Sequence, residues 1–223
     1  MRLVLASANP GKLREIRRLL ADLAVELLPL SDFPAAVGAP ETGETFLDNA
    51  IQKAAWVWRL AGVPAIADDS GLCVDALGGE PGVRSARYAE GGDDANNAKL
   101  LGALRDVPVA LRGAHFHCTV ALVGPPDHPA LMGPLPEGMS RLTAHAELPD
   151  GAVAVWAEGK VFGVIAGALD GQEGFGYDPL FIYPPEGRTF GVLSADLKNR
   201  VSHRAQAFGL LSAFLHGALS GSP

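Results

Sequence analysis

Two adjacent carboxylates, Asp68 and Asp69, come directly after an apolar run over residues 63–67. The run predicts a buried strand that ends at the two acids. Binding sites in open α/β sheets gather beyond the carboxyl ends of strands, so the pair is a candidate site. Consecutive strand residues face opposite ways, which predicts different roles for the two acids unless the strand bends. The alternative interpretation is a polar turn over residues 68–71.

A magnesium ion is the ligand that these acids favour, because adjacent buried carboxylates are costly without a neutralising cation. Glu41 lies in the loop before a predicted helix and could swing into the same cleft. Mg²⁺ prefers oxygen ligands, keeps several waters and shares the phosphate oxygens of its substrate. The candidate metal ligands are therefore Glu41, Asp68 and Asp69.

A phosphate-binding segment is predicted near the N-terminus. Residues 3–6 form a short apolar run, and residues 7–11 form a turn before an amphipathic helix. This order places loop N–H groups at a helix N-terminus, where anions bind readily. Ser7 and Asn9 add side-chain hydrogen bonds, and Lys12 adds a cation. The segment lacks the Walker pattern, and a solvated surface lysine is the alternative interpretation of Lys12.

Lys53 lies on the polar face of a second predicted helix, residues 45–61. Thr45 followed by Asp48 predicts a capping box at the beginning of this helix. Thr45, Asn49 and Lys53 are spaced four apart, so their side chains line up on one face. A solvated helix face is again the alternative interpretation.

A loop with two glycines, residues 174–178, is a further candidate binding segment. Glycine permits a tight backbone path, and an aromatic side chain held there could stack on a base. Lys198, His203 and Arg204 form a second polar group near the C-terminus. The alternatives are that Phe175 fills the core and that His203 is a structural histidine.

The remaining pattern mixes helices and strands and indicates an α/β fold with a long central sheet. Residues 124–151 are rich in Pro and Gly and predict a long excursion, either a flap or a hairpin. The other predicted elements are a helix over 96–104, strands over 115–123, 153–156 and 160–166, and a closing helix over 210–219.

Composition limits the classes of function. The chain has 223 residues, of which 48% are hydrophobic and 19% are charged, so it can bury a real core as one large domain or two small lobes. Its net charge of −7, without a basic run, argues against binding to polymeric nucleic acid. Cys73 and Cys118 form no Cys-x-x-Cys pair, which favours buried thiols in a reducing compartment. Without a signal-peptide core or an apolar stretch of about 20 residues, we expect a cytoplasmic protein with no membrane partner.

Taken together, the motifs resemble those of the inosine triphosphate pyrophosphatase family, and they occur in the family's order over nearly the whole chain. The matching segments are Ser7-Ala8-Asn9-Pro10-Gly11-Lys12, Glu41-Thr42-Gly43, Phe46-Leu47-Asp48-Asn49-Ala50 with Lys53, Ala67-Asp68-Asp69-Ser70-Gly71-Leu72, Ala76-Leu77-Gly78-Gly79-Glu80-Pro81-Gly82, Ser85-Ala86-Arg87-Tyr88, Phe175-Gly176-Tyr177-Asp178-Pro179 and Ser202-His203-Arg204.

This resemblance implies a single domain over residues 1–223 with an α/β fold. The expected architecture is an elongated mixed β-sheet with flanking helices and two lobes around a central cleft. The implied activity is Mg²⁺-dependent hydrolysis of nonstandard purine nucleoside triphosphates (ITP, dITP and XTP) to the monophosphate and pyrophosphate. Members of the family often form homodimers, so a homodimer is expected here.

The resemblance also implies roles for individual residues. Asp69 matches the proton acceptor and, with Glu41 and Asp68, a ligand of Mg²⁺. The triphosphate and the base with its sugar are expected to contact separate sets of residues. The substrate-binding residues are Ser7, Ala8, Asn9, Pro10, Gly11, Lys12 and Lys53 for the triphosphate, Phe175, Gly176, Tyr177 and Asp178 for the base and sugar, Lys198, His203 and Arg204 for the base, and Ser70 as a further substrate contact.

Three departures from the family pattern affect contacts rather than catalytic groups. Segment 124–151 is longer than usual, Leu197 stands where an acid is common, and Arg84 stands where an apolar residue is common. Two rival functions remain open. A Maf-type nucleotide pyrophosphatase would typically carry Ser-Pro-Arg-Arg in its first loop, where this chain has Asn-Pro-Gly-Lys at residues 9–12. A nucleotide-binding regulatory module would bind the nucleotide without hydrolysing it.

Overall fold

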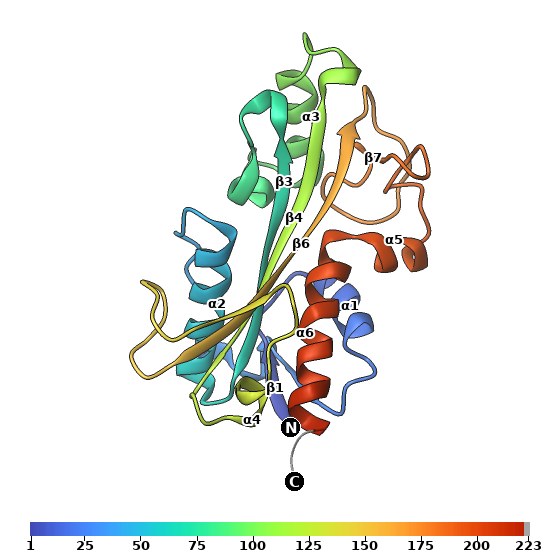
Figure 1. The fold of residues 1–223 in the computed structure, drawn as a ribbon. Coiled ribbons are helices and arrows are strands. Elements are labelled where there is room, and N and C mark those ends of the chain that lie inside the picture. The colour runs from blue at the N-terminus through green and yellow to red at the C-terminus, as the bar shows by residue number, and fades with distance from the viewer. Residues whose placement is uncertain (221–223) are drawn as a thin grey trace. The chain divides into compact units, whose positions relative to one another are not determined.

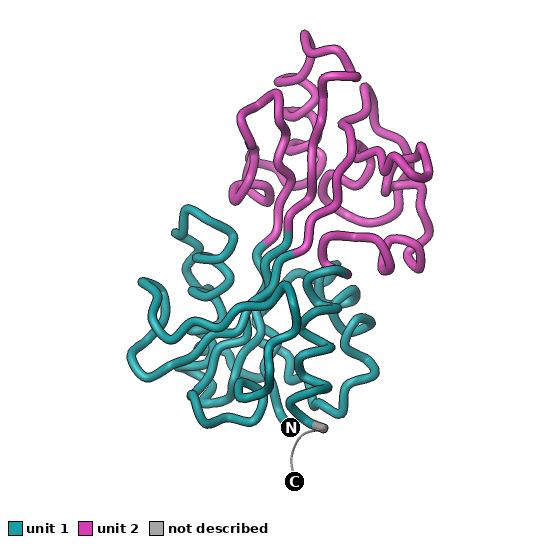
Figure 2. The backbone as a smooth tube through the Cα atoms, viewed as in Figure 1, with its two compact units in different colours: residues 1–69, 118–158, 206–223 teal, residues 70–117, 159–205 magenta. Residues whose placement is uncertain are grey.

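The computed structural model describes residues 1–220, and the chain divides into two compact units (Figure 2). Unit 1 comprises residues 1–69, 118–158 and 206 onward, and unit 2 comprises residues 70–117 and 159–205. Three long strands contribute residues to both units, namely β3 (Ala65–Val74), β4 (Gly113–Gly124) and β6 (Val153–Ile165).

The sheet of unit 1 is mixed and has the strand order β2-β1-β3-β4-β6. β1 (Arg2–Leu5) is parallel to β2 (Glu26–Pro29) and to β3, whereas β5 (Met139–Leu142) runs antiparallel along β6. The mixed α/β architecture predicted from the sequence is therefore confirmed.

Both faces of this sheet are covered by helices (Figure 1). Leu3 and Leu5 of β1 pack into a core that contains residues of α1 (Pro10–Leu19) and α6 (His203–Ser220). Val4 points into a second core, which contains residues of α2 (Phe46–Ala61). Neighbouring strand residues thus alternate between the two cores, as the pleat of a strand requires.

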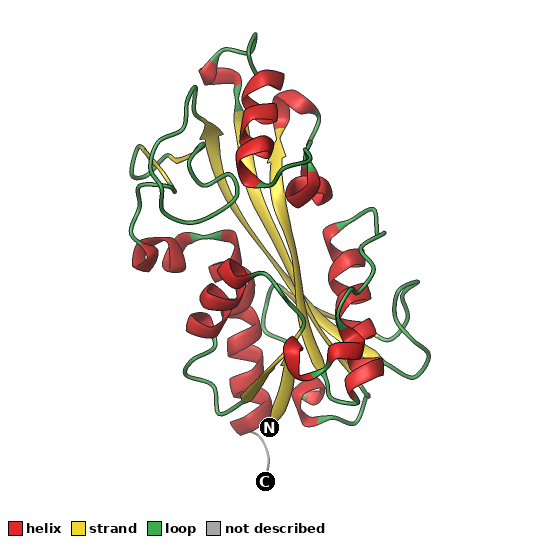
Figure 3. Cartoon of the chain, turned by 180° about the vertical axis from the view of Figure 1, so that it is seen from behind, coloured by secondary structure: helices red, strands yellow, loops and turns green. Residues whose placement is uncertain are grey.

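Unit 2 contains the other halves of the long strands and continues with β7 (Phe181–Tyr183) and β8 (Arg188–Thr189) in the order β3-β4-β6-β7-β8. Its core includes Leu100 of α3 (Asp93–Ala103) together with several strand residues. Figure 3 shows that much of the segment between β6 and α5 (Ala195–Val201) is loop. The short elements of both units are α4 (Pro129–Met132) and 3₁₀ turns at Leu30–Asp32, Pro34–Ala36, Asp75–Leu77, Gly82–Arg87 and Val109–Leu111.

β3 corrects one expectation from the sequence. The strand does not end at Ala67 but continues through Asp68 and Asp69 to Val74. Beyond the acids, Leu72 and Val74 are fully buried in the core of unit 2, which favours the extended backbone up to that point. The two carboxylates therefore lie inside a strand, where their charges need partners.

β6 corrects a second expectation, because the predicted strands over 153–156 and 160–166 are one continuous strand. Ala157, between them, is fully buried and pairs with Met139 of β5. Glu158 accepts a hydrogen bond from Thr119 of β4 at 3.3 Å. Sheet pairing and packing thus outweigh the weak strand preference of residues 157–160.

The other differences concern element ends. The hairpin alternative for residues 124–151 is confirmed, because β5 pairs with β6. α6 begins at His203, seven residues before the predicted helix over 210–219, and α5 was not predicted. Among residues 1–220, no helix is long and apolar enough to cross a membrane.

Candidate functional site

Lys53 is placed by the beginning of α2. The side chain of Thr45 accepts a hydrogen bond from the N–H of Asp48, and the carboxylate of Asp48 accepts from the N–H of Thr45, which completes the predicted capping box. The cap defines where the helix begins, and about two turns later Lys53 follows on the same face. Only 8% of Lys53 is exposed.

The ammonium group of Lys53 holds two carboxylates in unit 1. Its Nζ donates to Oδ1 of Asp69 at 2.9 Å and to Oε1 of Glu41 at 3.0 Å. The Asp69 side chain is 9% exposed, whereas that of Glu41 is 38% exposed. A buried acid next to a buried lysine is thus joined by a more accessible acid.

Burial and charge act against each other in this cluster. Burial lowers the pKa of Lys53, but attraction to Asp69, Asp68 and Glu41 outweighs it, so the pKa is raised and the ammonium form persists. Burial raises the pKa of Asp69, and attraction to Lys53 and Lys12 offsets this only in part. Asp69 is therefore a stronger base than an exposed aspartate.

Asp68 has a different partner from its neighbour Asp69. Nζ of Lys12 lies 2.9 Å from Oδ2 of Asp68, whose side chain is 1% exposed. This arrangement follows the alternation of side chains along β3. Each of the two strand carboxylates is neutralised by its own lysine, which explains how β3 tolerates them in its interior.

The loop before α1 differs from the expected anion site. The side-chain oxygen of Asn9 accepts from the N–H groups of Gly11 at 2.9 Å and Lys12 at 3.1 Å. Pro10, the first helical residue, has no N–H to offer. In this structure the N–H groups of Gly11 and Lys12, which were expected to face a phosphate, donate to the side chain of Asn9. The remaining donors for an anion are the ammonium of Lys12 and the side chains of Ser7 and Asn9.

Asn49 is a residue of this cluster that the sequence did not assign. It is 1% exposed, and its amide donates to Oδ2 of Asp69 at 3.2 Å and to the carbonyl of Gly43 at 3.3 Å. Its oxygen accepts from the N–H of Gly43 at 2.9 Å. Asn49 thus ties the loop that carries Glu41 to Asp69. Its position in the sequence was the available signal, because Asn49 lies four residues after Thr45 and four before Lys53, on the same face of the helix.

The carboxylates provide a partial fit to a magnesium ion. Among residues 1–220, no three His, Cys, Asp or Glu side chains converge as a metal site. Glu41 and Asp69 nevertheless meet at one cation, the ammonium of Lys53, whereas Asp68 faces Lys12. Mg²⁺ often takes only one or two protein carboxylates and completes its shell with water and phosphate oxygens. The donor set fits Mg²⁺ held by Glu41 and Asp69.

A second polar cluster lies within unit 2, around the loop over residues 175–178. Oδ2 of Asp178 accepts from the N–H of Phe175 at 2.8 Å and from Nζ of Lys198 at 2.5 Å. Asp178 is 2% and Lys198 is 5% exposed. Lys198 is carried by α5, and Ser194 is the N-cap of that helix. The buried ion pair fixes the conformation of the loop from within.

The ring of Phe175 lies next to two cations. Nζ of Lys198 is 4.8 Å and Cζ of Arg204 is 5.6 Å from its centroid, within the range of cation–π attraction. Nη2 of Arg204 donates to the hydroxyl of Ser70 at 3.0 Å. Phe175 is only half-buried, so it is not core filler. Ser70, Phe175, Lys198 and Arg204 are thus brought together.

Tyr177 and His203, by contrast, lie in the packed interior of unit 2. The Tyr177 hydroxyl donates to the carbonyl of Ser85 at 2.9 Å, and burial raises the pKa of this phenol. The ring of His203 stacks on Phe116 with 4.9 Å between centroids and 14° between planes. Both residues are at most 5% exposed.

Two further residues of this cluster were missed by the sequence analysis. Asp93 and Asn97 of α3 both contact the backbone of Gly176. Gly176 follows Asp93 by 83 residues and Asn97 by 79 residues. Local sequence carries no signal for such pairings.

A scan of protein families matches residues 3–214 to the Ham1 family. The chain belongs to the Ham1 family. The match covers the first strand, both polar clusters and most of α6, and it confirms the family predicted from the ordered motifs.

Curated relatives of this Ham1 family member cover nearly its whole length. A dITP/XTP pyrophosphatase from Geobacter sulfurreducens is 45% identical over 216 residues, or 96% of both chains. One from Pseudomonas syringae is 48% identical over 210 residues, or 94% of both chains.

Solved structures agree with the Ham1 assignment. A HAM1 protein from Coxiella burnetii has a TM-score of 0.79 at 37% identity and covers 97% of this chain and 98% of its own. A nucleoside-triphosphatase / dITP/XTP pyrophosphatase from Mycobacterium abscessus has a TM-score of 0.67 at 39% identity and covers 90% of this chain and 93% of its own.

In this Ham1 family member, segment 124–151 contacts the beginning of α2. Nε2 of His145 lies 3.2 Å from Oδ1 of Asp48. Nε2 of Gln52 donates to Oε2 of Glu147 at 3.1 Å and to the hydroxyl of Thr42 at 2.9 Å. The segment thus braces the helix and loop that carry Lys53 and Glu41.

Proposed function

We propose that this protein hydrolyses the nonstandard purine nucleoside triphosphates dITP, XTP and ITP to the monophosphate and pyrophosphate, and so cleanses the nucleotide pool. The observation that carries the proposal is the buried cluster in which Lys53 holds Asp69 and Glu41. Full-length relatives that are 45% and 48% identical and named dITP/XTP pyrophosphatase support the same activity.

Asp69 is the proposed proton acceptor. Its carboxylate takes a proton from a water molecule, and the water oxygen forms a bond to the α-phosphorus. The bond from that phosphorus to the bridging oxygen breaks, and pyrophosphate leaves with the electron pair. The raised pKa of Asp69 supports this role, because a stronger base removes the proton more readily.

The cations of unit 1 are proposed to stabilise the charge on the phosphates. Lys12 and Lys53 supply two ammonium groups. The side chains of Ser7 and Asn9 supply hydrogen-bond donors in the loop that also contains Ala8, Pro10 and Gly11. Lys53 is held by Asp69 and Glu41, so its position is set before the substrate arrives. Mg²⁺, held by Glu41 and Asp69 when bound, would neutralise phosphate charge and polarise the phosphoryl oxygens. Asp68 contributes by holding Lys12.

The cluster of unit 2 is proposed to bind the base and sugar. Hypoxanthine and xanthine carry an acceptor at position 6, where adenine carries a donor. Arg204 and Lys198 offer donors beside the half-buried ring of Phe175, on which a purine could stack. An adenine amino group facing such donors leaves both unpaired, which discriminates strongly. His203 and Tyr177 support this cluster through packing.

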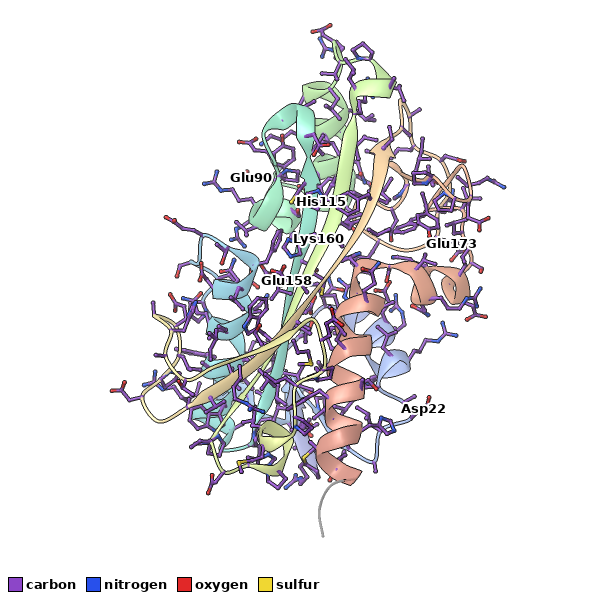
Figure 4. All side chains as sticks on the ribbon, viewed as in Figure 1. Asp22, Glu90, His115, Glu158, Lys160 and Glu173 are labelled. Carbon is purple, nitrogen blue, oxygen red and sulfur yellow. The ribbon has the colours of Figure 1, made fainter. Side chains whose placement is uncertain are left out.

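A homodimer and a cytoplasmic location complete the proposal. Phe162 of β6 is 66% exposed, with its ring 5.4 Å from that of His115 on β4. Burial lowers the pKa of His115, and the charge of Lys160 lowers it further, so Lys160 lies near His115. Both residues are labelled in Figure 4. An exposed aromatic side chain is what a subunit interface would cover.

The proposal is tested by measuring pyrophosphate release in the presence of Mg²⁺ from ITP, dITP, XTP, ATP, GTP, dTTP and UTP. We expect kcat/KM to be at least about tenfold higher for the first three than for the others. Hydrolysis of dTTP or UTP instead would favour a Maf-type enzyme. Binding of ITP without hydrolysis would favour a regulatory module and overturn the proposal.

A further inference from the structure

α3 holds both polar backbone groups of one residue in the loop over 175–178. Oδ2 of Asp93 accepts from the N–H of Gly176 at 2.7 Å. Nδ2 of Asn97 donates to the carbonyl of Gly176 at 2.9 Å. Asp93 and Asn97 are four residues apart and therefore lie on the same face of the helix. Together they form a two-point clamp on Gly176.

The clamped residue stands between the two side chains that organise the base-binding cluster. Phe175 precedes Gly176 and presents its ring to Lys198 and Arg204. Asp178 follows two residues later and binds Lys198. Gly176 has φ of +64°, a conformation that favours glycine, so the loop turns at this point. The clamp therefore holds the peptide groups that directly follow Phe175 in this turn.

Neither clamp residue is explained by the stability of α3 alone. The N-cap of α3 is Gly92, and no side chain caps the helix, so Asp93 contributes its carboxylate to Gly176 rather than to its own helix end. Asn97 is 4% exposed, and among residues 1–220 its Oδ1 has no hydrogen-bond partner. A buried amide oxygen without a partner is unfavourable. The contact that Asn97 does make is the one to Gly176.

We propose that Asp93 and Asn97 are positioning residues that fix Phe175 through Gly176 and thereby set the discrimination between 6-oxopurines and adenine. This inference rests on the proposed function, because it assigns base recognition to the cluster of unit 2. Asp93 and Asn97 belong to unit 2, whereas the residues proposed to bind the phosphates belong to unit 1, so loss of the clamp should change base selection and leave phosphate binding intact.

The experiment compares Asp93→Ala with Asp94→Ala. Both residues are acids in the first turn of α3, so both substitutions remove the same favourable charge from the helix N-terminus. Of the two acids, Asp93 is the one whose carboxylate accepts from the N–H of Gly176. Asp93→Asn keeps an acceptor oxygen and serves as the conservative rescue. Asn97→Ala removes the second contact, and its thermal unfolding is measured to verify that it folds.

Two readouts separate positioning from general damage. The first is the ratio of kcat/KM for dITP to that for dATP, and the second is the dissociation constant of inosine monophosphate set against that of tripolyphosphate with Mg²⁺. For Asp93→Ala and Asn97→Ala we expect the ratio to fall by about tenfold, because a small misplacement of a binding group is costly. Inosine monophosphate should bind more weakly, with tripolyphosphate binding unchanged. Asp94→Ala and Asp93→Asn should behave like the unmodified protein.

The possible failures are distinguishable. If the unmodified protein does not prefer dITP over dATP, the proposed function fails and the clamp with it. If it does prefer dITP and folded Asp93→Ala and Asn97→Ala keep that ratio, the clamp proposal alone is overturned. An equal loss of inosine monophosphate and tripolyphosphate binding would also overturn it, because that result indicates a general structural effect.

Discussion

Lys53 and Asp69 form an ion pair with 2.9 Å between Nζ and Oδ1, and their side chains are 10% and 9% exposed. Neither charge can be removed without leaving the other without its partner in a desolvated environment. The pair therefore couples the stability of unit 1 to the groups proposed for catalysis. It also keeps a carboxylate of raised pKa in one place before a substrate binds.

Replacing Lys53 alone should destabilise the protein. We expect Lys53→Met to lower the free energy of unfolding by about 3–5 kcal/mol, because Asp69 is left buried and unpaired. Urea unfolding followed by circular dichroism measures this change, with Arg59→Ala on the exposed face of α2 as the control. The double variant Lys53→Met/Asp69→Leu should regain most of the stability while remaining inactive. An unaltered unfolding midpoint for Lys53→Met would contradict this account.

Asp69→Asn should reduce turnover while the protein remains folded. Loss of the proton acceptor is expected to lower kcat by about 10²- to 10⁴-fold at saturating Mg²⁺. Asp68→Asn is the matched variant, because it changes the adjacent carboxylate that binds Lys12. Its effect should fall mainly on KM for the triphosphate. Near-normal kcat for Asp69→Asn would assign the proton acceptor elsewhere.

Asn49→Ala should weaken the link between Asp69 and the loop that carries Glu41. The side chain makes three hydrogen bonds, one to Asp69 and two to Gly43, and its removal leaves buried polar groups unpaired. We expect a loss of about 1–3 kcal/mol in unfolding free energy. The Mg²⁺ concentration for half-maximal activity should also rise. Arg59→Ala, on the exposed face of the same helix, should leave this Mg²⁺ dependence unchanged.

The Cys73 thiol should react slowly with alkylating reagents. Burial raises its pKa, and the nearby charge of Lys160 offsets this only in part. Since the thiolate is the reactive form, a raised pKa means less thiolate at pH 8. The reaction rate should therefore continue to increase with pH beyond the pH at which an ordinary thiol is fully ionised. Iodoacetamide labelling followed by mass spectrometry across pH 7–10 measures the rate. Labelling of Cys73 at pH 7 as fast as that of a free cysteine would show that the thiol is not suppressed.

The proposed homodimer should depend on Phe162. We expect Phe162→Asp to shift the molecular mass measured by light scattering from that of a dimer to that of a monomer, because a charge in an apolar interface is costly. Leu169→Asp changes another exposed apolar residue, 57% exposed, and serves as the control. A monomeric mass for the unmodified protein would reject the homodimer itself.

Local signals explain which parts of the fold were predicted. The capping box of α2 needs only Thr45 and Asp48, three residues apart, and the sequence located it correctly. The continuation of β3 through Asp68 and Asp69 was not predicted, because it depends on Lys12 and Lys53 from other elements. From local sequence alone, a carboxylate after an apolar run predicts the end of a strand, because the distant lysine that neutralises it cannot be identified.

The same distinction applies to the site. The family motifs marked Lys53, Asp69, Phe175 and Arg204, whose placement in two clusters agrees with their expected grouping. They did not indicate that Asn9 caps α1 with its own side chain, since a donor for phosphate and a helix cap have the same residue type. Nor could they reveal the contact of Asp93 with Gly176, which lies 83 residues away.

The route of the chain through the two units has a consequence for its synthesis. Unit 1 is assembled from three separate stretches, and α6 brings Phe208, Leu211 and Phe214 into the core beneath β1. A nascent chain on the ribosome therefore carries Leu3 and Leu5 without the part of their cover that α6 supplies until that helix has been made. Domains usually fold one after another as they emerge. Here the synthesis of unit 2 begins after that of unit 1 but is completed before it. The core around β1, the first strand, is completed only when α6, the last helix, has been made.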